Sequence, residues 1–232
     1  CNSKENHASG GIGLISSRLN VEGPIEKDKG SFIVSARRTY ADLFLKLSKD
    51  TNTNRSSLYF YDINAKANYK LGKKDRIYLS GYFGKDYLGL GNTFGIDYGN
   101  ATATLRWNHI LSSRLFSNTS LIYSKYDYNI RINSGNNDIG ITSYIRDYHL
   151  KEDLQYYANA DNKINFGIDV ISHTTSPGVI SASQNSSYNA ITVQNRHALE
   201  SAAYFSHDLA LSDKVNLNYG LRAGLFTVMG PG

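Results

Sequence analysis

Histidine and acidic side chains are the residues of this sequence whose types and spacing would support chemistry. The chain of 232 residues contains six histidines, which are His7, His109, His149, His173, His197 and His207. None occurs in a His-Glu-x-x-His spacing or with cysteine in a metal-binding pattern. The sequence also lacks a Gly-x-Ser-x-Gly elbow, and Gly89-Leu90-Gly91 lacks the next glycine of a dinucleotide fingerprint. We therefore assign no catalytic, cofactor or metal residue and expect that the protein is not an enzyme.

Two of the histidines have an aspartate close by in the sequence. On a strand, alternate side chains point to the same face, so Asp147 and His149 would share a face. By the same rule, His207 and Asp208 would point to opposite faces. We interpret Asp147 and His149 as a satisfied structural pair rather than as a catalytic dyad.

Composition limits the classes of protein that this chain fits. The formal net charge of +5 is spread along the sequence, without the basic stripe that nucleic-acid binding needs. The chain has 18 tyrosines but only one cysteine, which excludes an intrachain disulfide framework. No apolar run is long enough for a transmembrane helix. Cys1, followed by small polar residues, is either the lipid-bearing residue of a processed lipoprotein or the point at which the given sequence starts in mid-protein.

Alternation of apolar and polar residues is the main structural signal. From Tyr59 to Leu71 the odd positions are aromatic or apolar, and from Asp62 onward the even ones are polar. The same period recurs in the ranges 101–108, 163–170 and 215–225. Successive strand side chains point to opposite faces, so each of these segments predicts a strand with one apolar and one polar face.

Less regular strands are expected between these segments. They are Gly11–Ile25, Ser31–Arg38, Arg76–Lys85, Arg114–Ile130, Ile141–Tyr157 and Val193–Leu211, which brings the total to about ten strands. The segment Tyr40–Lys46 is either a helical turn or a continued strand. Aromatic residues near strand ends predict membrane-interface girdles; the pairs are Tyr59 and Tyr61, Tyr82 and Phe83, Tyr126 and Tyr128, and Tyr156 and Tyr157.

The predicted connections alternate between short and long. Short polar turns are expected at 26–30, 72–75, 112–113, 160–162 and 212–214. Longer loops are expected at 48–56, 89–95, 133–138 and 174–190. Short turns at one end and long loops at the other are typical of transmembrane β-barrels. The sequence thus predicts an all-β, antiparallel up-and-down transmembrane barrel segment.

Several of these segments resemble the early barrel strands of TonB-dependent outer-membrane receptors, particularly the large receptors of Bacteroidetes-type bacteria. The segments that carry the resemblance are 11–19 with 22–25, 30–40, 78–84, 99–108 and 219–222. The resemblance implies a barrel of about 22 strands that imports a metal chelate, vitamin or glycan. It also implies a plug domain, a TonB-binding box and a cell outer-membrane location in a Gram-negative bacterium.

This sequence departs from the family pattern, because it shows no plug, no TonB box and about ten strands. We therefore expect residues 1–232 to be a partial barrel domain, with the plug absent and TonB engaged through the parent protein. Outer-membrane lipid is an expected partner, a surface lipoprotein is a further one, and the small-molecule or glycan ligand is unknown. Arg18, Lys66 and Arg106 are expected to face the lumen and to meet the plug, but we assign them to no binding site.

Two alternatives remain open at this point. One is a complete ten-stranded outer-membrane protease of the omptin type, in which Asp127, Asp138 and Asp147 with His149 would lie near the extracellular rim. The other is a soluble all-β binding module.

Overall fold

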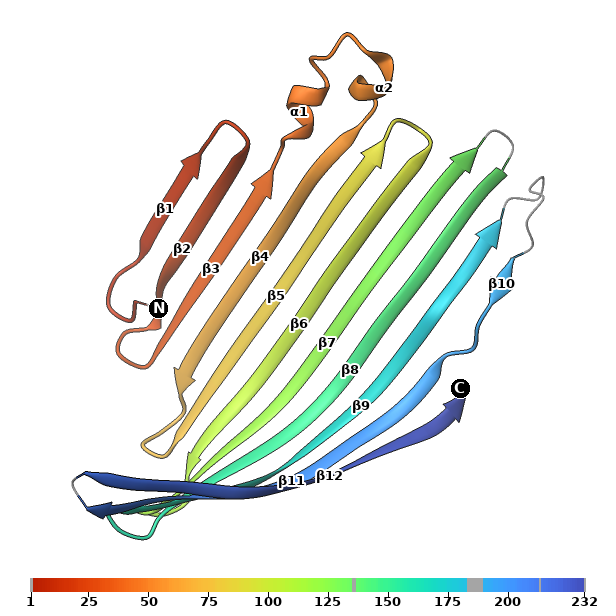
Figure 1. The fold of residues 1–232 in the computed structure, drawn as a ribbon. Helices are drawn as coiled ribbons and strands as arrows, with labels where there is room; N and C mark the ends of the chain where they lie inside the picture. Colours follow the sequence, from red (N-terminus) through yellow and green to blue (C-terminus); the bar gives the residue numbers. More distant parts are fainter. Residues whose placement is uncertain (1, 135–136, 183–189, 213, 232) are drawn as a thin grey trace.

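The computed structural model describes residues 2–134, 137–182, 190–212 and 214–231. These residues form one antiparallel sheet with two short helices at one end (Figure 1). The elements are β1 (His7–Ile12), β2 (Ser16–Glu26), β3 (Gly30–Thr39), α1 (Asp42–Leu45), α2 (Thr51–Asn54), β4 (Ser57–Lys70), β5 (Asp75–Leu90), β6 (Phe94–Ile110), β7 (Leu115–Ser134), β8 (Asn137–Tyr157), β9 (Asn162–Ala182), β10 (Ile191–Thr192), β11 (Arg196–Ser212) and β12 (Val215–Pro231).

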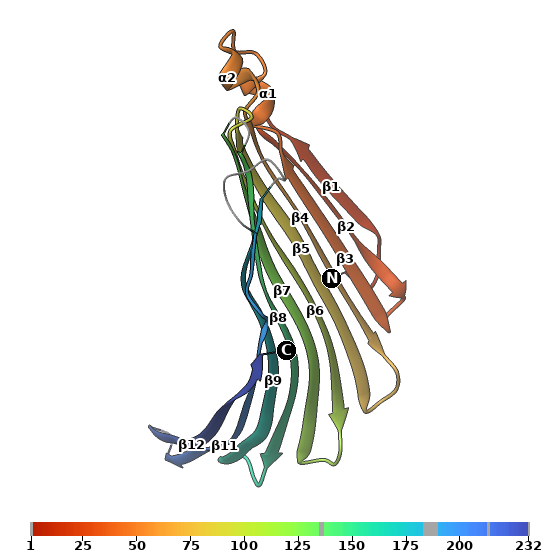
Figure 2. The same ribbon diagram turned by 90° about the vertical axis from the view of Figure 1, so that its right-hand side faces the viewer.

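Each long strand pairs with its neighbours in sequence, in the order β1 to β9 followed by β11 and β12. The two-residue strand β10 pairs with the end of β9. The sheet is open and strongly curved, and the lower parts of β11 and β12 swing away from the first strands (Figure 2). This up-and-down order confirms the predicted fold class.

Cross-strand pairing aligns the alternating patterns of all the strands on the same two faces. Leu79, Leu105, Leu121, Leu150 and Val170 are paired in turn across β5 to β9. We call the face that carries this row the apolar face. The opposite face carries Lys66, Arg106 and most of the other charged side chains, and we call it the polar face. All four of the regular sequence patterns place their apolar residues on the apolar face.

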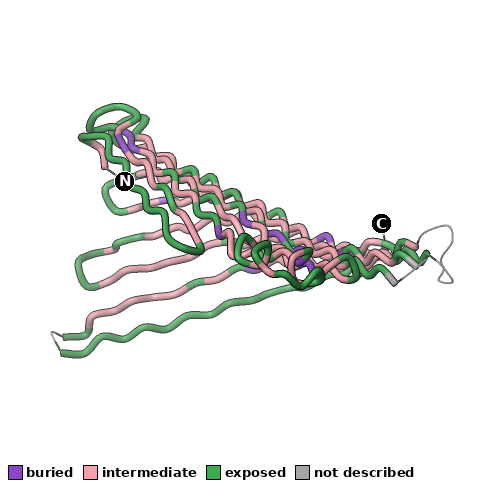
Figure 3. Tube along the Cα trace, turned by 90° about the horizontal axis from the view of Figure 1, so that it is seen from above, coloured by how far each residue is buried: buried purple, intermediate pink, exposed green. Residues whose placement is uncertain are grey.

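The sheet has no hydrophobic core of its own among the residues that are described. Ala202 is the one apolar side chain there that counts as buried, whereas Leu121 is 52% exposed and Tyr148 is 55% exposed. Figure 3 accordingly shows mainly exposed and intermediate residues along the trace. A soluble β-sandwich buries one face of each sheet against the other, whereas the described residues form a single sheet with no second sheet packed against it. In the ranges that the structure covers, no helix has the length and apolar character needed to cross a membrane.

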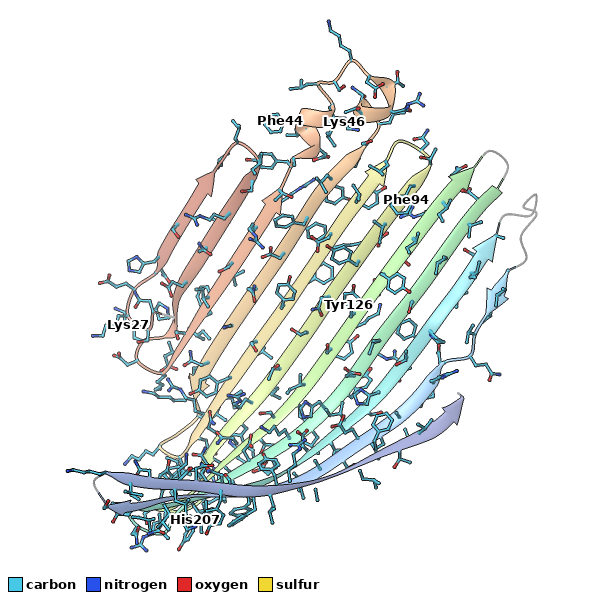
Figure 4. All side chains as sticks on the ribbon, in the orientation of Figure 1. Lys27, Phe44, Lys46, Phe94, Tyr126 and His207 are labelled. Carbon is cyan, nitrogen blue, oxygen red and sulfur yellow. The ribbon has the colours of Figure 1, made fainter. Side chains whose placement is uncertain are left out.

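The two ends of the sheet differ in their connections. At the turn end, the strands are joined by the short segments 27–29, 71–74, 111–114 and 158–161. Asp28 adopts a positive φ of 62° in the first of these turns, a conformation that Asp tolerates better than most residues. At the loop end, the connection 40–56 carries α1 and α2. Figure 4 labels Lys27 at the turn end and Phe44 and Lys46 at the loop end.

Several predicted boundaries were wrong. The first predicted strand is a hairpin, because Gly13 turns the chain and its N–H donates to the Ser16 carbonyl at 2.8 Å. The expected loop at 89–95 is a tight turn around Gly91, which has a φ of 56°. Of the two alternatives for Tyr40–Lys46, the structure has the helical turn, α1, whereas α2 was not predicted.

The largest boundary error concerns the long loop predicted at 174–190, because β9 continues to Ala182. Pro177 and Gly178 lie where the pairing of β8 with β9 shifts register between Thr142 and Tyr144. Gly178 has a φ of 144°, so this dipeptide forms a bulge instead of a turn. The rest of that predicted loop, residues 183–189, lies outside the described residues.

The carboxylate of Asp50 caps α2. Its Oδ2 accepts hydrogen bonds from the Thr53 N–H at 2.7 Å and the Thr53 hydroxyl at 2.8 Å. The backbone hydrogen bond from Thr53, with that from its hydroxyl, lowers the pKa of Asp50. The ionised cap is thus favoured in the folded loop and is lost as the pH falls through this lowered pKa.

We expect the amide resonance of Thr53 to titrate with a midpoint below about 3.9, the ordinary aspartate pKa. NMR of the protein with labelled threonine measures this midpoint. The variant Asp50→Asn is the control and removes the titration. A midpoint at or above the ordinary value would contradict the capping role.

Candidate functional site

The polar face carries, on β2, β4 and β6, the three basic residues that the sequence predicted to face the lumen. Arg18 is paired with Arg37, and Arg37 is paired with Asp62. Lys66 is paired with Ser80, which is itself paired with Thr104, two residues before Arg106. Since side chains two residues apart share a face, Arg18, Lys66 and Arg106 all lie on the polar face. That these residues face a lumen and meet a plug stays a prediction.

Arg37 and Asp62 form an ion pair between β3 and β4 on the polar face. The Arg37 Nε donates to Asp62 Oδ2 at 2.8 Å, and its Nη2 lies 2.7 Å from the same oxygen. The guanidinium of Arg37 also lies 4.8 Å from the centre of the Phe60 ring. A second region, between Lys66 and Arg106, forms a shallow groove that also includes Asn68. These groups suit a polar, hydrogen-bonding partner.

A histidine with two acidic neighbours lies farther along the polar face, across β8, β9 and β11. The His173 Nδ1 lies 2.8 Å from Asp147 Oδ1, and its Nε2 lies 3.7 Å from Glu200 Oε2. Asp147 and His173 are directly paired across the two strands. The three side chains are therefore held by the sheet register, with each on a different strand.

A second histidine cluster lies beside the first. The His149 Nε2 hydrogen-bonds with Asp169, and the Arg222 Nη2 donates to the other carboxylate oxygen of Asp169 at 3.2 Å. Arg222 reaches this carboxylate from β12, two strands away, and its guanidinium lies 5.7 Å from the centre of the Tyr204 ring. The Asp169 side chain is only 12% exposed, so the two partners stabilise it in a poorly solvated position.

Tyr204 extends this network because its hydroxyl donates to Asp153 on β8, across the intervening strand β9. The ring passes Gly167, where an added Cβ would lie 2.5 Å from the tyrosine hydroxyl oxygen. A glycine at this position is thus what allows a side chain to bridge three strands.

The predicted Asp147–His149 pair is only partly right. The two residues do share the polar face, yet each is bound to a residue of β9, Asp147 to His173 and His149 to Asp169. The prediction for the other pair is confirmed, because His207 bonds to Tyr219 and Asn162 whereas Asp208 bonds to Asn165.

The acidic residues considered for a protease do not converge. Asp147 is paired with Ser124, so Asp127, three residues farther along β7, points to the opposite face. Asp138 is paired with Asn133 near the loop end. Among the residues that can be assessed, no group of three His, Cys, Asp or Glu side chains is arranged to hold a metal ion. The carboxylates that the protease alternative would need therefore do not meet at one point of the sheet.

Aromatic girdles were predicted from four residue pairs, and the structure separates them. Tyr59 and Tyr61 do lie together on the apolar face, where Tyr59 stacks on Tyr87 at 5.2 Å between ring centres. Tyr126 and Tyr128 instead lie on the polar face, because Tyr126 is paired with Ile145, whose side chain belongs to the polar face of β8. The remaining two pairs are split between the faces. Sequence position alone did not reveal which face each ring occupies.

Comparison of the whole fold with solved structures gives consistent matches. The ferric preacinetobactin receptor BauA from Acinetobacter baumannii superimposes with a TM-score of 0.69 at 9% identity, covering 96% of this chain and 41% of that chain. The copper transporter OprC matches with a TM-score of 0.70 at 11% identity, covering 95% of this chain and 37% of that one. The ferric enterobactin receptor PfeA from Pseudomonas aeruginosa matches with a TM-score of 0.68 at 13% identity, covering 99% and 40%.

This chain has the barrel fold of TonB-dependent receptors. The chain spans about two-fifths of the length of the receptors it matches. No protein-family model and no curated protein matches the sequence. In the receptor-barrel fold, the apolar face corresponds to the outer wall and the polar face to the lumen wall.

Proposed function

We propose that residues 1–232 are part of the barrel domain of an outer-membrane TonB-dependent receptor that imports a scarce nutrient into a Gram-negative cell. The observation that carries this proposal is a single sheet of neighbour-paired strands with one apolar face and one charged face, in which the described residues form no buried core. Such a sheet buries its apolar face in lipid and turns its polar face toward a lumen.

The substrate class that we propose is a metal chelate. The similar structures are named as receptors for ferric preacinetobactin, ferric enterobactin and ferric catecholate and as a copper transporter. Basic side chains of the polar face, such as Arg18, Lys66 and Arg106, suit an anionic chelate passing along the lumen. A vitamin or a glycan is the alternative outcome of the test below.

Energy for import would come from the TonB complex, acting through a plug domain of the parent receptor. In this proposal the polar face contacts that plug. The Asp147–His173–Glu200 and His149–Asp169–Arg222 clusters then hold β8 to β12 as a rigid wall against which a plug moves. Outer-membrane lipid and a surface lipoprotein at the loop end are the other partners that we propose.

The experiment is an uptake assay in the native host. Cells lacking the parent gene, cells lacking TonB and complemented cells are compared for accumulation of iron-55 supplied as chelates, with labelled vitamin and glycan as further arms. We expect both deletions to lower chelate uptake to the same background level. Vitamin or glycan uptake that depends on both genes would show that the substrate is a vitamin or a glycan and not a metal chelate. Chelate uptake that depends on the gene but not on TonB would contradict the mechanism.

A further inference from the structure

Five basic side chains gather at the loop end of the apolar face. They are Arg38, Lys85, Lys125, Arg131 and Arg146, on β3, β5, β7 and β8, and we call them the outward basic patch. Lys125 is paired directly with Arg146. The sequence patterns did not single out these residues, because they only appear as polar interruptions in otherwise apolar positions.

The outward basic patch continues directly from the apolar part of this face. Along β7, Lys125 follows Tyr123 on the same face, and along β8, Arg146 precedes Tyr148. The Tyr123 and Tyr148 rings are in contact, with centres 5.4 Å apart. The face therefore changes from apolar through aromatic to basic over neighbouring residue pairs, which is the order in which a membrane changes from acyl chains to headgroups.

Positive charge remains after the ion pairs within the patch are counted. Asp97 is only 4% exposed and lies 2.8 Å from the Lys85 Nζ and 3.4 Å from the Arg131 Nη2. Asp127 lies 3.2 Å from the Lys125 Nζ. The basic residues still present exposed surface, since the Arg131 side chain is 69% exposed and that of Lys125 is 40% exposed.

Arg146 has unused hydrogen-bonding capacity. Its Nε is buried and has no hydrogen-bond partner among the described residues. Its guanidinium lies 6.0 Å from the centre of the Tyr144 ring and 5.9 Å from that of Tyr148. An arginine held between two aromatic rings at a membrane boundary, next to Lys125, suits a phosphate oxygen.

We propose that the outward basic patch binds the phosphate groups of anionic lipids in the leaflet on the loop-end side of the membrane. The inference rests on the proposed membrane location of the apolar face. Charge complementarity and continuity with that face point to a lipid headgroup. The acyl chains of the same lipid cover Leu121 and Leu150, which are 52% and 42% exposed. A free phosphate would meet only the basic side chains, because the ion lacks the acyl chains that cover the apolar face.

The test compares two double variants of the full-length protein. Lys125→Gln with Arg146→Gln removes two charges from the patch, and Lys66→Gln with Arg106→Gln removes two charges from the polar face. Native mass spectrometry of detergent-solubilised protein measures the retention of added phosphatidylglycerol and phosphatidylcholine. Each basic side chain contributes about 5-fold to anionic-lipid affinity, so we expect roughly 25-fold weaker phosphatidylglycerol retention in the patch variant.

The control variant should retain phosphatidylglycerol like the wild type, and inorganic phosphate should not displace the lipid. Equal retention in both variants, or an equal preference of the wild type for phosphatidylcholine, would overturn the lipid proposal. Flotation with vesicles is the separate check on membrane location. Wild-type protein that does not float would defeat the proposed function itself, whereas floating protein without phosphatidylglycerol preference would defeat only this inference.

Discussion

Replacing Leu105 with arginine is expected to prevent stable insertion of the barrel. Leu105 lies in the middle of the apolar row, paired with Leu79 on one side and Leu121 on the other, and is 41% exposed. An arginine there would place its charge against lipid acyl chains. The cost of Arg at the midplane of a barrel's lipid face is about 2–4 kcal/mol, a large part of the stability of a typical domain.

Urea unfolding of the full-length protein in phospholipid vesicles measures this loss. Thr102→Arg, on the same strand but on the polar face, is the matched control because it adds the same side chain beside Tyr82 and Ser124. We expect the control to change the free energy of unfolding by under about 0.5 kcal/mol. Equal losses in the two variants would show that the faces are not divided between lipid and lumen.

Gly167→Ala is expected to lower the free energy of unfolding by about 1–3 kcal/mol through overpacking. The added Cβ would clash with the Glu152 carbonyl oxygen and would lie 2.5 Å from the Tyr204 hydroxyl oxygen. The tyrosine side chain can rotate away only by losing its hydrogen bond to Asp153. The backbone carbonyl cannot rotate without disturbing the pairing of β8 with β9.

Gly224→Ala provides the control, because Gly224 also lies on the polar face and its added Cβ would be 3.9 Å from the nearest heavy atom, the Ser201 carbonyl oxygen. We expect this variant to be as stable as the wild type or slightly more stable, since alanine restricts the unfolded chain. Tyrosine fluorescence during urea titration follows both variants. A Gly167→Ala protein as stable as the Gly224→Ala protein would refute the bridging role of Tyr204.

The alternating pattern was sufficient to predict the two faces of the sheet. Every odd position from Tyr59 to Tyr69 does lie on the apolar face, because pleating fixes the side of each residue once a strand forms. Strand ends were harder to predict. Pro177 and Gly178 are typical turn residues, and only the pairing partner on β8 shows that they form a bulge within β9.

The contacts of the polar face could not be predicted from one sequence. The partner of Asp147 is His173, on another strand, and the sequence does not reveal the register that pairs them. The outward basic patch was missed for a related reason. Lys125 and Arg146 are far apart in the chain, and each alone resembles an ordinary polar interruption.

Neighbour-only pairing has a consequence for how this wall is assembled and how it diversifies. Because the backbone of each long strand pairs only with the long strands adjacent to it in sequence, the wall can form one hairpin at a time, with each hairpin templating the next. Although the connection 40–56 is long, β3 and β4 pair without a shift in register. Evolution can therefore graft or duplicate hairpins, and exchange surface loops, without redesigning the rest of the wall.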